Sequence, residues 1–317
     1  MRLALLVLVL LPISCNPRMP LAGSAPTQPE ATSCLELGAD SGRSLPSAAD
    51  VAALTVTPPP ASAPGSLPNY FLHVPPNAPT DHPLQLLLVL HGFGGQGQDF
   101  SAQFLPAADA NQWLVVAPTL NYTSLSDAAQ TRDDDLQIAQ QLTAIIADVP
   151  QRSGVAVRGR VLVLGFSRGG SMAERFALLH PELVQAVAAL SGGAYTVPQP
   201  CATQNGTVQS LPLPLGTADF QREAGYGFDA DTFRRIPFWL SVGSDDTQPV
   251  PSLYDDVLGQ TRVARGAAMQ QALLVFGVQS QFTVFPGIGH AVSDAMVSAA
   301  TGFLAGFSVQ EPNQSKV

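Results

Sequence analysis

The chain has 317 residues, of which 46% are hydrophobic, and it carries a formal net charge of -9. This length and composition suffice to bury one large core or two smaller ones, which excludes a disordered chain. Of its 15 basic residues only Lys316 is lysine, and the arginines form no basic cluster. The sequence therefore argues against nucleic acid as a partner.

The N-terminus is typical of an export signal. Arg2 precedes an apolar run, Leu3–Leu11, that is too short to span a bilayer as a helix. We therefore predict a signal peptide over residues 1–15 and an extracytoplasmic location. Cys15 lies where a bacterial lipoprotein signal places its lipidated cysteine, which would tether the protein to a membrane. Because the leucine of such a signal falls one position too early here, plain signal cleavage and a buried cysteine stay open alternatives.

The composition after the signal predicts three further regions. Residues 16–33 are rich in Pro, Ala, Ser and Thr without an apolar period, which favours a flexible tether. We expect one folded domain over 34–310 and a short tail over 311–317. The remaining cysteines, Cys34 and Cys201, form an even pair in an exported chain, so we predict a disulfide between them. Two unrelated thiols are the alternative.

Short apolar runs alternate with amphipathic segments through most of the predicted domain. The expected strands cover residues 69–75, 84–90, 113–118, 160–165, 184–191, 236–244 and 281–287. The expected helices cover residues near 98–110, 133–149, 171–180, 255–276 and 294–307. Such alternation predicts an α/β fold with a doubly wound, mostly parallel sheet.

The alternation breaks over residues 192–235, which carry several prolines and glycines. An insertion of this length is typical of a cap that shapes a substrate pocket. A surface excursion without a catalytic role is the other interpretation, and the sequence favours neither.

The stretch GFSRG, Gly165–Gly169, follows an apolar strand and opens a helix. A strand that turns into a helix within one or two residues strains the residue at the turn, and small neighbours relieve the crowding. Such a turn exposes the hydroxyl of Ser167 above the carboxyl ends of the strands. Because a serine hydroxyl is a weak nucleophile at neutral pH, another group must activate it.

The chain offers five histidines as the activating base: His73, His82, His91, His180 and His290. The first two flank early loops, the third opens a glycine-rich loop, and the fourth ends the helix that Ser167 begins. His290 lies between the last expected strand and the last expected helix, where a doubly wound sheet delivers a side chain over its carboxyl edge. We therefore predict His290 as the base.

A charged imidazole is oriented by a carboxylate, and Asp245 and Asp246 both follow the strand before the last. Either could serve. The developing negative charge on a reacting carbonyl needs N–H donors, and we expect the backbone N–H groups of Phe93 and Arg168 to form this oxyanion hole. His91 is expected to hydrogen-bond within the glycine loop and hold its shape.

The order of HGFGG, GFSRGG, GSDD and GIGH over residues 68–307 resembles the α/β-hydrolase superfamily. Within it the chain is similar to secreted and lipoprotein esterases grouped with polyhydroxybutyrate depolymerases and feruloyl esterases. The resemblance implies Ser167 as nucleophile, His290 as base and Asp246 as acid, with no cofactor. The expected activity is hydrolysis of a small-molecule or polymeric carboxylic ester through an acyl-enzyme. A peptidase, an acyltransferase and a non-catalytic surface binding module are the alternatives.

Two charged features allow other interpretations. The side chain of Arg168 could bind an anionic substrate group or pair with an acid such as Asp133, and an exposed structural arginine is the favoured reading. The run RDDD, Arg132–Asp135, could suggest a metal site, but acids that open a helix without a nearby histidine are more typical of a solvated helix start. No metal site is therefore predicted.

Overall fold

The computed structural model describes residues 67–308 except residues 80, 125, 205 and 206. The predicted signal peptide, the lipidation of Cys15, the tether and the tail lie outside the described residues. Cys34 lies outside them too, so its disulfide with the buried Cys201 stays a prediction. Within the described ranges, no helix is long and apolar enough to cross a membrane.

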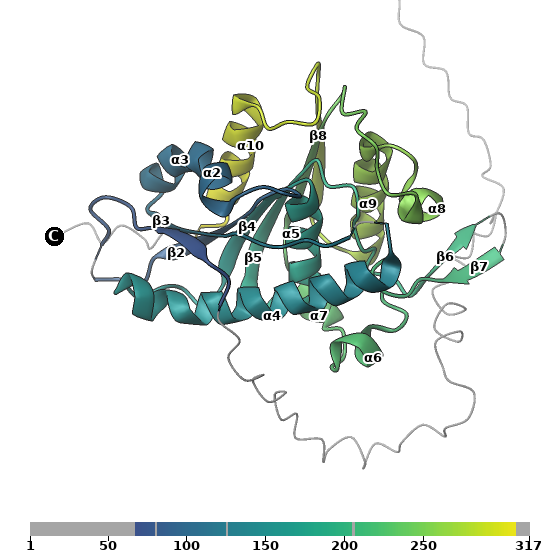
Figure 1. Ribbon diagram of the computed structural model, residues 1–317, viewed down its shortest axis with the longest axis horizontal. Helices are drawn as coiled ribbons and strands as arrows, with labels where there is room; N and C mark the ends of the chain where they lie inside the picture. The colour runs from purple at the N-terminus through teal and green to yellow at the C-terminus, as the bar shows by residue number, and fades with distance from the viewer. Residues whose placement is uncertain (1–66, 80, 125, 205–206, 309–317) are drawn as a thin grey trace, which may run out of the picture.

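A seven-stranded sheet forms the centre of the domain, with the strands in the order β1-β3-β2-β4-β5-β8-β9 (Figure 1). Its members are β1 (Tyr70–His73), β2 (Gln85–Leu90), β3 (Trp113–Pro118), β4 (Val161–Phe166), β5 (Val184–Leu190), β8 (Phe238–Gly243) and β9 (Ser280–Phe285). Only β1 at one edge runs antiparallel to its neighbour; the other six strands are parallel. The expected α/β class with a mostly parallel sheet is confirmed.

Helices cover both faces of the sheet (Figure 1). The longer ones are α4 (Ala128–Ser153), α5 (Arg168–Leu179), α9 (Arg262–Phe276) and α10 (Asp294–Ala305). The shorter ones are α2 (Gly97–Ser101), η2 (Ala102–Phe104), α3 (Leu105–Ala110), η3 (Pro181–Leu183), α6 (Phe220–Ala224), α7 (Ala230–Phe233), η4 (Ser252–Tyr254) and α8 (Asp255–Leu258). Apolar residues of α4, α5 and α9 belong to one core cluster, and those of α3 and α10 belong to a second.

Strand β2 illustrates why the central strands read as unbroken apolar runs. Leu86, Leu88 and Leu90 contribute to the first core, whereas Leu87 and Val89 contribute to the second, and all five are fully buried. Each such side chain stabilises the fold by roughly 1.5–3 kcal/mol relative to exposure. Burial on both faces therefore removes the alternation of polar residues that a half-exposed strand shows.

Two predicted helices differ from the observed ones. The helix expected over 255–276 is divided, because Gly259 has a φ of 97° and ends α8, and the Thr261 side chain then caps a new helix, α9. The helix expected from Asp133 begins instead at Ala128, where the side chain of Asp127 accepts a hydrogen bond from the backbone of Gln130. The run of acids consequently lies inside α4 rather than at its start.

The early start of α4 corrects the interpretation of the RDDD run. Asp133 is exposed, but Asp135 is 1% exposed and shares the buried face of α4 with Ile138 and Leu142. Its carboxylate accepts hydrogen bonds from both Arg168 and Arg175 of α5. Buried charges require such pairing, so this carboxylate links α4 to the helix that follows Ser167.

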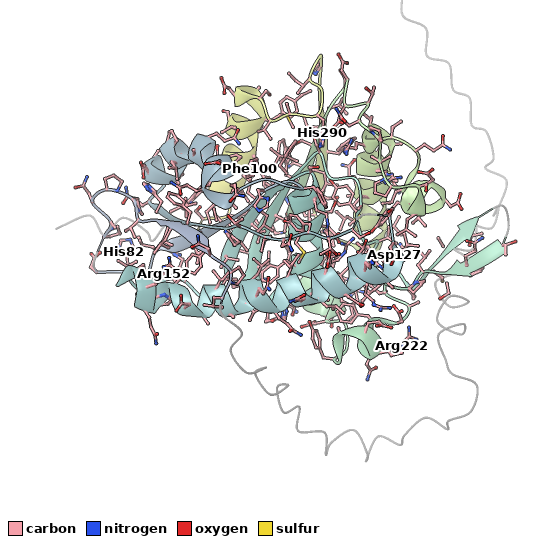
Figure 2. The ribbon with its side chains drawn as sticks, in the orientation of Figure 1. His82, Phe100, Asp127, Arg152, Arg222 and His290 are labelled. Atoms are coloured by element: carbon pink, nitrogen blue, oxygen red, sulfur yellow. The ribbon has the colours of Figure 1, made fainter. Side chains whose placement is uncertain are left out.

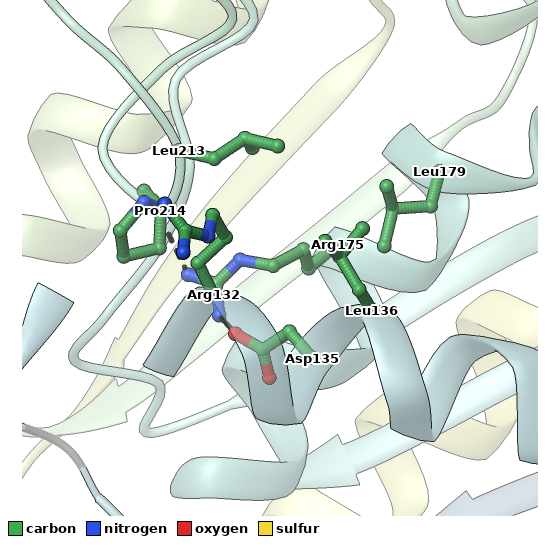
Figure 3. A pocket seen from close by; sticks show the side chains of 7 residues that line it. All are labelled: Arg132, Asp135, Leu136, Arg175, Leu179, Leu213 and Pro214. Atoms are coloured by element: carbon green, nitrogen blue, oxygen red, sulfur yellow. Dashed lines mark hydrogen bonds and ion pairs between the residues drawn. The ribbon is translucent and has the colours of Figure 1, made fainter. Parts of the chain in front are cut away.

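Figure 3 shows Asp135 directed at Arg175 beside a small hollow between α4 and α5. Arg175 also donates to the hydroxyl of Thr196 over 2.6 Å and to the carbonyl of Ala194 over 2.5 Å. The guanidinium therefore attaches the chain after β5 to the same pair of helices. Polar networks of this kind fix one arrangement of the elements when their members are satisfied.

A second acid of α5, Glu174, is fully buried and accepts a hydrogen bond from the backbone N–H of Thr196 over 3.0 Å. Its other carboxylate oxygen has no partner among the described residues. Burial raises the pKa of Glu174 to about 8, although the charge of Arg175 and the hydrogen bond from Thr196 lower it in part. Between about pH 4.5 and pH 8, the folded protein therefore keeps Glu174 protonated, whereas the unfolded chain releases the proton.

Replacement of this acid, Glu174→Gln, should make the protein more stable at alkaline pH. Because the pKa is about 8 folded and near 4.5 unfolded, the stability that the wild-type acid contributes falls as pH rises from about 4.5 to about 8. The variant lacks this loss, so its free energy of unfolding should exceed that of wild type by about 2–5 kcal/mol at pH 9. Urea denaturation at pH 5 and pH 9 measures the difference. The surface variant Glu182→Gln is the control, and an equal difference at both pH values would contradict the prediction.

Candidate active site

Ser167 lies at the turn between β4 and α5, with φ 55° and ψ -117°. A non-glycine residue rarely adopts a positive φ, and such strain is typical of functional turns. The turn is crowded by backbone: a Cβ at Gly165 would clash with the carbonyl of Gly169, and a Cβ at Gly169 would clash with the carbonyls of Leu90 and His91. The two glycines are therefore required for strand and helix to cross this closely.

His290 connects Ser167 to Asp246. Its Nε2 lies 2.9 Å from the Ser167 Oγ, and its Nδ1 lies 2.8 Å from an Asp246 Oδ. Because the ionised carboxylate can only accept, Nδ1 carries the proton and Nε2 is free to accept from the serine hydroxyl. The structure thus brings together the three side chains that the resemblance implies. Asp245 does not join them: it is exposed and accepts a hydrogen bond from the Ser244 hydroxyl over 2.7 Å.

The environment of Asp246 favours its charged form. Burial raises the pKa of this carboxyl, but its polar partners, led by the hydrogen bond from His290 and the positive charge of Arg262, outweigh burial, so the pKa lies below its ordinary value. Asp246 is therefore an anion at neutral pH, as an acid that orients an imidazole must be.

Aromatic rings form one wall of this site. Phe166 stacks on the imidazole of His290 with ring centroids 4.9 Å apart, and Phe100 stacks on Phe166 at 5.9 Å. Figure 2 shows Phe100 and His290 at the upper end of the sheet, where the strands next to Ser167 end. Both phenylalanine rings are partly exposed, so an apolar surface adjoins the serine hydroxyl.

The glycine loop after β2 lies against Ser167. A Cβ at Gly92 would be 3.3 Å from the Cβ of Ser167. Within the described ranges, the backbone N–H of Phe93 donates to no acceptor, and the Phe93 side chain is 55% exposed. Arg168 is the first residue of α5, where N–H groups have no acceptor in a preceding turn of the helix. The two N–H groups without an acceptor therefore belong to the loop that lies against Ser167 and to the residue that follows Ser167.

His91 joins the glycine loop to the end of β3. Its Nδ1 donates to the carbonyl of Gly92 over 2.6 Å, and its Nε2 accepts the backbone N–H of Leu120 over 2.8 Å. Burial lowers the pKa of His91, which the hydrogen bond to Gly92 offsets only in part. The neutral ring therefore contacts two backbone segments at once, as its expected role in the loop requires.

The side chain of Arg168 differs from the sequence-based interpretation. It is buried rather than exposed, and it pairs with Asp135 instead of Asp133. Its guanidinium also lies 4.8 Å from the centre of the Tyr122 ring. No part of this side chain faces solvent, so it is not placed to bind an anionic substrate group. The change of partner arises because Asp135 lies on the buried face of α4, whereas Asp133 lies on its exposed face.

Arg262 is a member of the site that the sequence analysis missed. It is the first residue of α9 and lies 16 positions beyond Asp246, to which its guanidinium donates over 3.0 Å. No motif marks it, since an arginine in the first turn of a helix is commonly exposed.

The inserted segment, residues 192–235, contains the hairpin of β6 (Cys201–Gln204) and β7 (Thr207–Ser210) together with α6 and α7. Tyr226 donates to the carbonyl of Leu179 over 2.9 Å, at the end of α5 remote from Ser167. In Figure 2, Arg222 of α6 lies at the lower side of the molecule and His290 at the upper side. The segment around α6 thus contacts the end of α5 away from Ser167, which fits an excursion better than a cap over the site.

Among the described residues, no group of three or more His, Cys, Asp or Glu side chains is arranged to hold a metal ion. Asp133–Asp135 face different surroundings along α4, which separates their carboxylates.

Comparisons with solved structures show the same fold. The structure of esterase PE8 is 21% identical and has a TM-score of 0.51, with coverage of 76% of this chain and 98% of that one. Poly(aspartic acid) hydrolase-1 from Sphingomonas sp. KT-1 is 17% identical with a TM-score of 0.54, covering 76% and 93%. A phospholipase/carboxylesterase from Dyadobacter fermentans DSM 18053 is 17% identical with a TM-score of 0.51, covering 76% and 98%.

The comparison with curated proteins gave no match. The model of the Alpha/beta hydrolase family matches residues 87–303, which is more than half of the chain. The match begins in strand β2 and ends in helix α10. The chain belongs to the α/β-hydrolase family and is a hydrolase.

Proposed function

We propose that the protein hydrolyses carboxylic esters through an acyl-enzyme, with Ser167 as nucleophile, His290 as base and Asp246 as acid. The observation that carries this proposal is the continuous hydrogen-bonded chain from the Ser167 Oγ through both nitrogens of His290 to Asp246, at a strained turn between strand and helix. A hydroxyl next to an oriented base is the arrangement that acyl transfer needs.

In the proposed first step, the Ser167 Oγ attacks the ester carbonyl carbon while His290 Nε2 takes the hydroxyl proton. The carbonyl oxygen becomes an oxyanion, and the N–H groups of Phe93 and Arg168 stabilise it. Collapse of this intermediate breaks the bond to the alcohol, which leaves with the proton from His290. Water then attacks the acyl-serine with the same base, releasing the carboxylic acid and restoring Ser167. This route requires no cofactor or metal.

The surroundings of Ser167 favour esters with an apolar acyl or aryl group. Phe93 is exposed within the glycine loop, and the rings of Phe166, which stacks on His290, and of Phe100 are partly exposed. Apolar surface of this kind gains free energy when an apolar group covers it. Small or medium esters are thus the first candidates. The closer resemblance to polyhydroxybutyrate depolymerases and feruloyl esterases extends the candidates to polymer and feruloyl esters.

The N-terminal sequence adds a proposed location. A charged residue followed by the short apolar run before Cys15 favours export, and lipidation of Cys15 would keep the enzyme on a membrane. The substrate would then be an ester met outside the cytoplasm.

The proposal is tested with a fluorophosphonate, which reacts with activated serines. We expect the purified protein to be labelled at Ser167, located by peptide mass spectrometry, and His290→Ala to abolish the labelling because the base is gone. The same preparation should hydrolyse p-nitrophenyl esters. Comparing esters with acyl chains of increasing length then shows how long an acyl group the apolar surface beside Ser167 accommodates.

Matched p-nitrophenyl ester and p-nitroanilide substrates distinguish an esterase from a peptidase, and added alcohols reveal acyl transfer. A folded protein that no fluorophosphonate labels and that cleaves none of these substrates would overturn the proposal in favour of a non-catalytic binding module.

A further inference from the structure

The carboxylate of Asp246 has two charged or chargeable partners rather than one. One oxygen accepts from His290 Nδ1 over 2.8 Å, and the other accepts from an Arg262 guanidinium nitrogen over 3.0 Å. Both Asp246 and Arg262 are buried, with exposed fractions of 3% and 9%. The reaction described above requires only the first contact, so the second needs its own account.

Arg262 is held in place by backbone as well as by Asp246. Its guanidinium donates to the carbonyl of Gln248 over 2.8 Å and to that of Pro249 over 3.4 Å. These residues belong to the same loop as Asp246, and the side chain of Thr261 caps the helix directly before Arg262. The first residue of α9 therefore holds both the Asp246 carboxylate and the loop that carries it.

Resting on the proposed function, we propose that Arg262 is a positioning residue: it holds the Asp246 carboxylate toward His290 and opposes protonation of the imidazole. The geometry carries both parts. A guanidinium that occupies one carboxylate oxygen leaves the other in a fixed orientation for Nδ1. Arg262 and the His290 ring bind the same carboxylate, so the positive charge of Arg262 lies close to the ring. It therefore disfavours a second positive charge on His290 and keeps the base neutral to lower pH.

Among the described residues, the other charged side chains near the pair have partners of their own. Asp245, next to Asp246 in the loop, is turned to the Ser244 hydroxyl. Arg265, one turn further along α9, is paired with Asp255 and donates to backbone carbonyls. The nearest aromatic neighbour of His290, Phe166, carries no charge. Tyr195 is a further titratable group close enough to interact with the charge of Arg262. It is neutral, since burial raises its pKa.

The experiment follows the titration of His290 by NMR in wild type, Arg262→Gln and Arg262→Lys, with the His290 signal assigned from its loss in His290→Ala. The glutamine keeps a hydrogen-bond donor but removes the charge, and the lysine keeps the charge. We expect the titration midpoint of His290 to rise by roughly half a unit in Arg262→Gln and to stay at the wild-type value in Arg262→Lys.

The acid limb of the pH profile of kcat/KM for a p-nitrophenyl ester should move by the same amount. Both variants should lower kcat about tenfold without a matching rise in KM, because the carboxylate is less well oriented. Arg265→Gln is the matched control: it removes an arginine one turn further along α9 and should lower the melting temperature while leaving the His290 midpoint unchanged.

An unmoved midpoint in Arg262→Gln, or an equal shift in Arg265→Gln, would overturn the role of Arg262. If Arg262→Gln does not fold, a shifted midpoint in Arg262→Lys overturns it equally. The NMR titration needs no turnover, so it separates this proposal from the proposed function. A shifted midpoint in a protein without Ser167-dependent hydrolysis would overturn only the latter.

Discussion

Replacement of the proposed nucleophile, Ser167→Ala, should lower kcat/KM for p-nitrophenyl acetate by about 10⁴-fold or more. In the proposed reaction this hydroxyl forms the covalent bond to the acyl carbon, and nothing else in the described site can take its place. Residual turnover would come from the N–H donors and from substrate binding. Alanine adopts the same strained backbone as serine here, so the melting temperature should change little. Initial rates with a matched thermal melt measure both quantities.

Ser171→Ala is the control for this experiment, because Ser171 lies one turn later in α5 with its hydroxyl accepting the backbone N–H of Ala194 over 3.1 Å. Its kcat/KM should stay within a few-fold of wild type. Hydrolysis that persists unchanged in Ser167→Ala would mean that the reaction does not pass through this hydroxyl.

The largest loss of stability is expected from Asp135→Ala. This carboxylate is the shared acceptor of Arg168 and Arg175, all three side chains being nearly inaccessible to solvent. Its removal leaves two guanidinium groups buried without their counter-charge, which costs about 3–5 kcal/mol. Urea denaturation at pH 7 gives the free energy of unfolding. Because Arg168 directly follows the proposed nucleophile, kcat/KM should fall as well.

Asp133→Ala tests the same run of three acids two positions earlier. Its side chain is 66% exposed and pairs with Arg132 at the surface, so its removal should cost less than about 1 kcal/mol. Similar losses in the two variants would contradict the view that Asp135 is a buried link between α4 and α5.

The parts of the site that could be predicted are those with a local signature. The glycines around Ser167 mark a turn that few other residue patterns permit. His290 is predictable as the base because the chain has only five histidines and one of them follows the last strand. The unbroken apolar runs of the parallel strands indicated the sheet in the same way, since burial on both faces leaves a simple pattern.

The parts that escaped prediction depend on contacts between distant segments. Asp135 and Arg168 are 33 positions apart, and each looks like an ordinary surface charge in its own segment. Only the packing of α4 on α5 turns them into a buried pair. Arg262 contacts Asp246 because Gly259 ends one helix and Thr261 begins another, a break that the apolar period across residues 255–276 concealed.

The close crossing at Gly165 and Gly169 has a consequence for altering the enzyme by directed evolution. The position of Ser167 depends on contacts between main-chain atoms, which a change of side chain elsewhere does not disturb. Libraries that vary Phe93 and Phe100 can therefore test the proposed activity on new acyl groups while Ser167, the proposed nucleophile, stays where it is. Libraries that include either glycine would consist mostly of inactive clones, because any side chain there separates the strand from the helix.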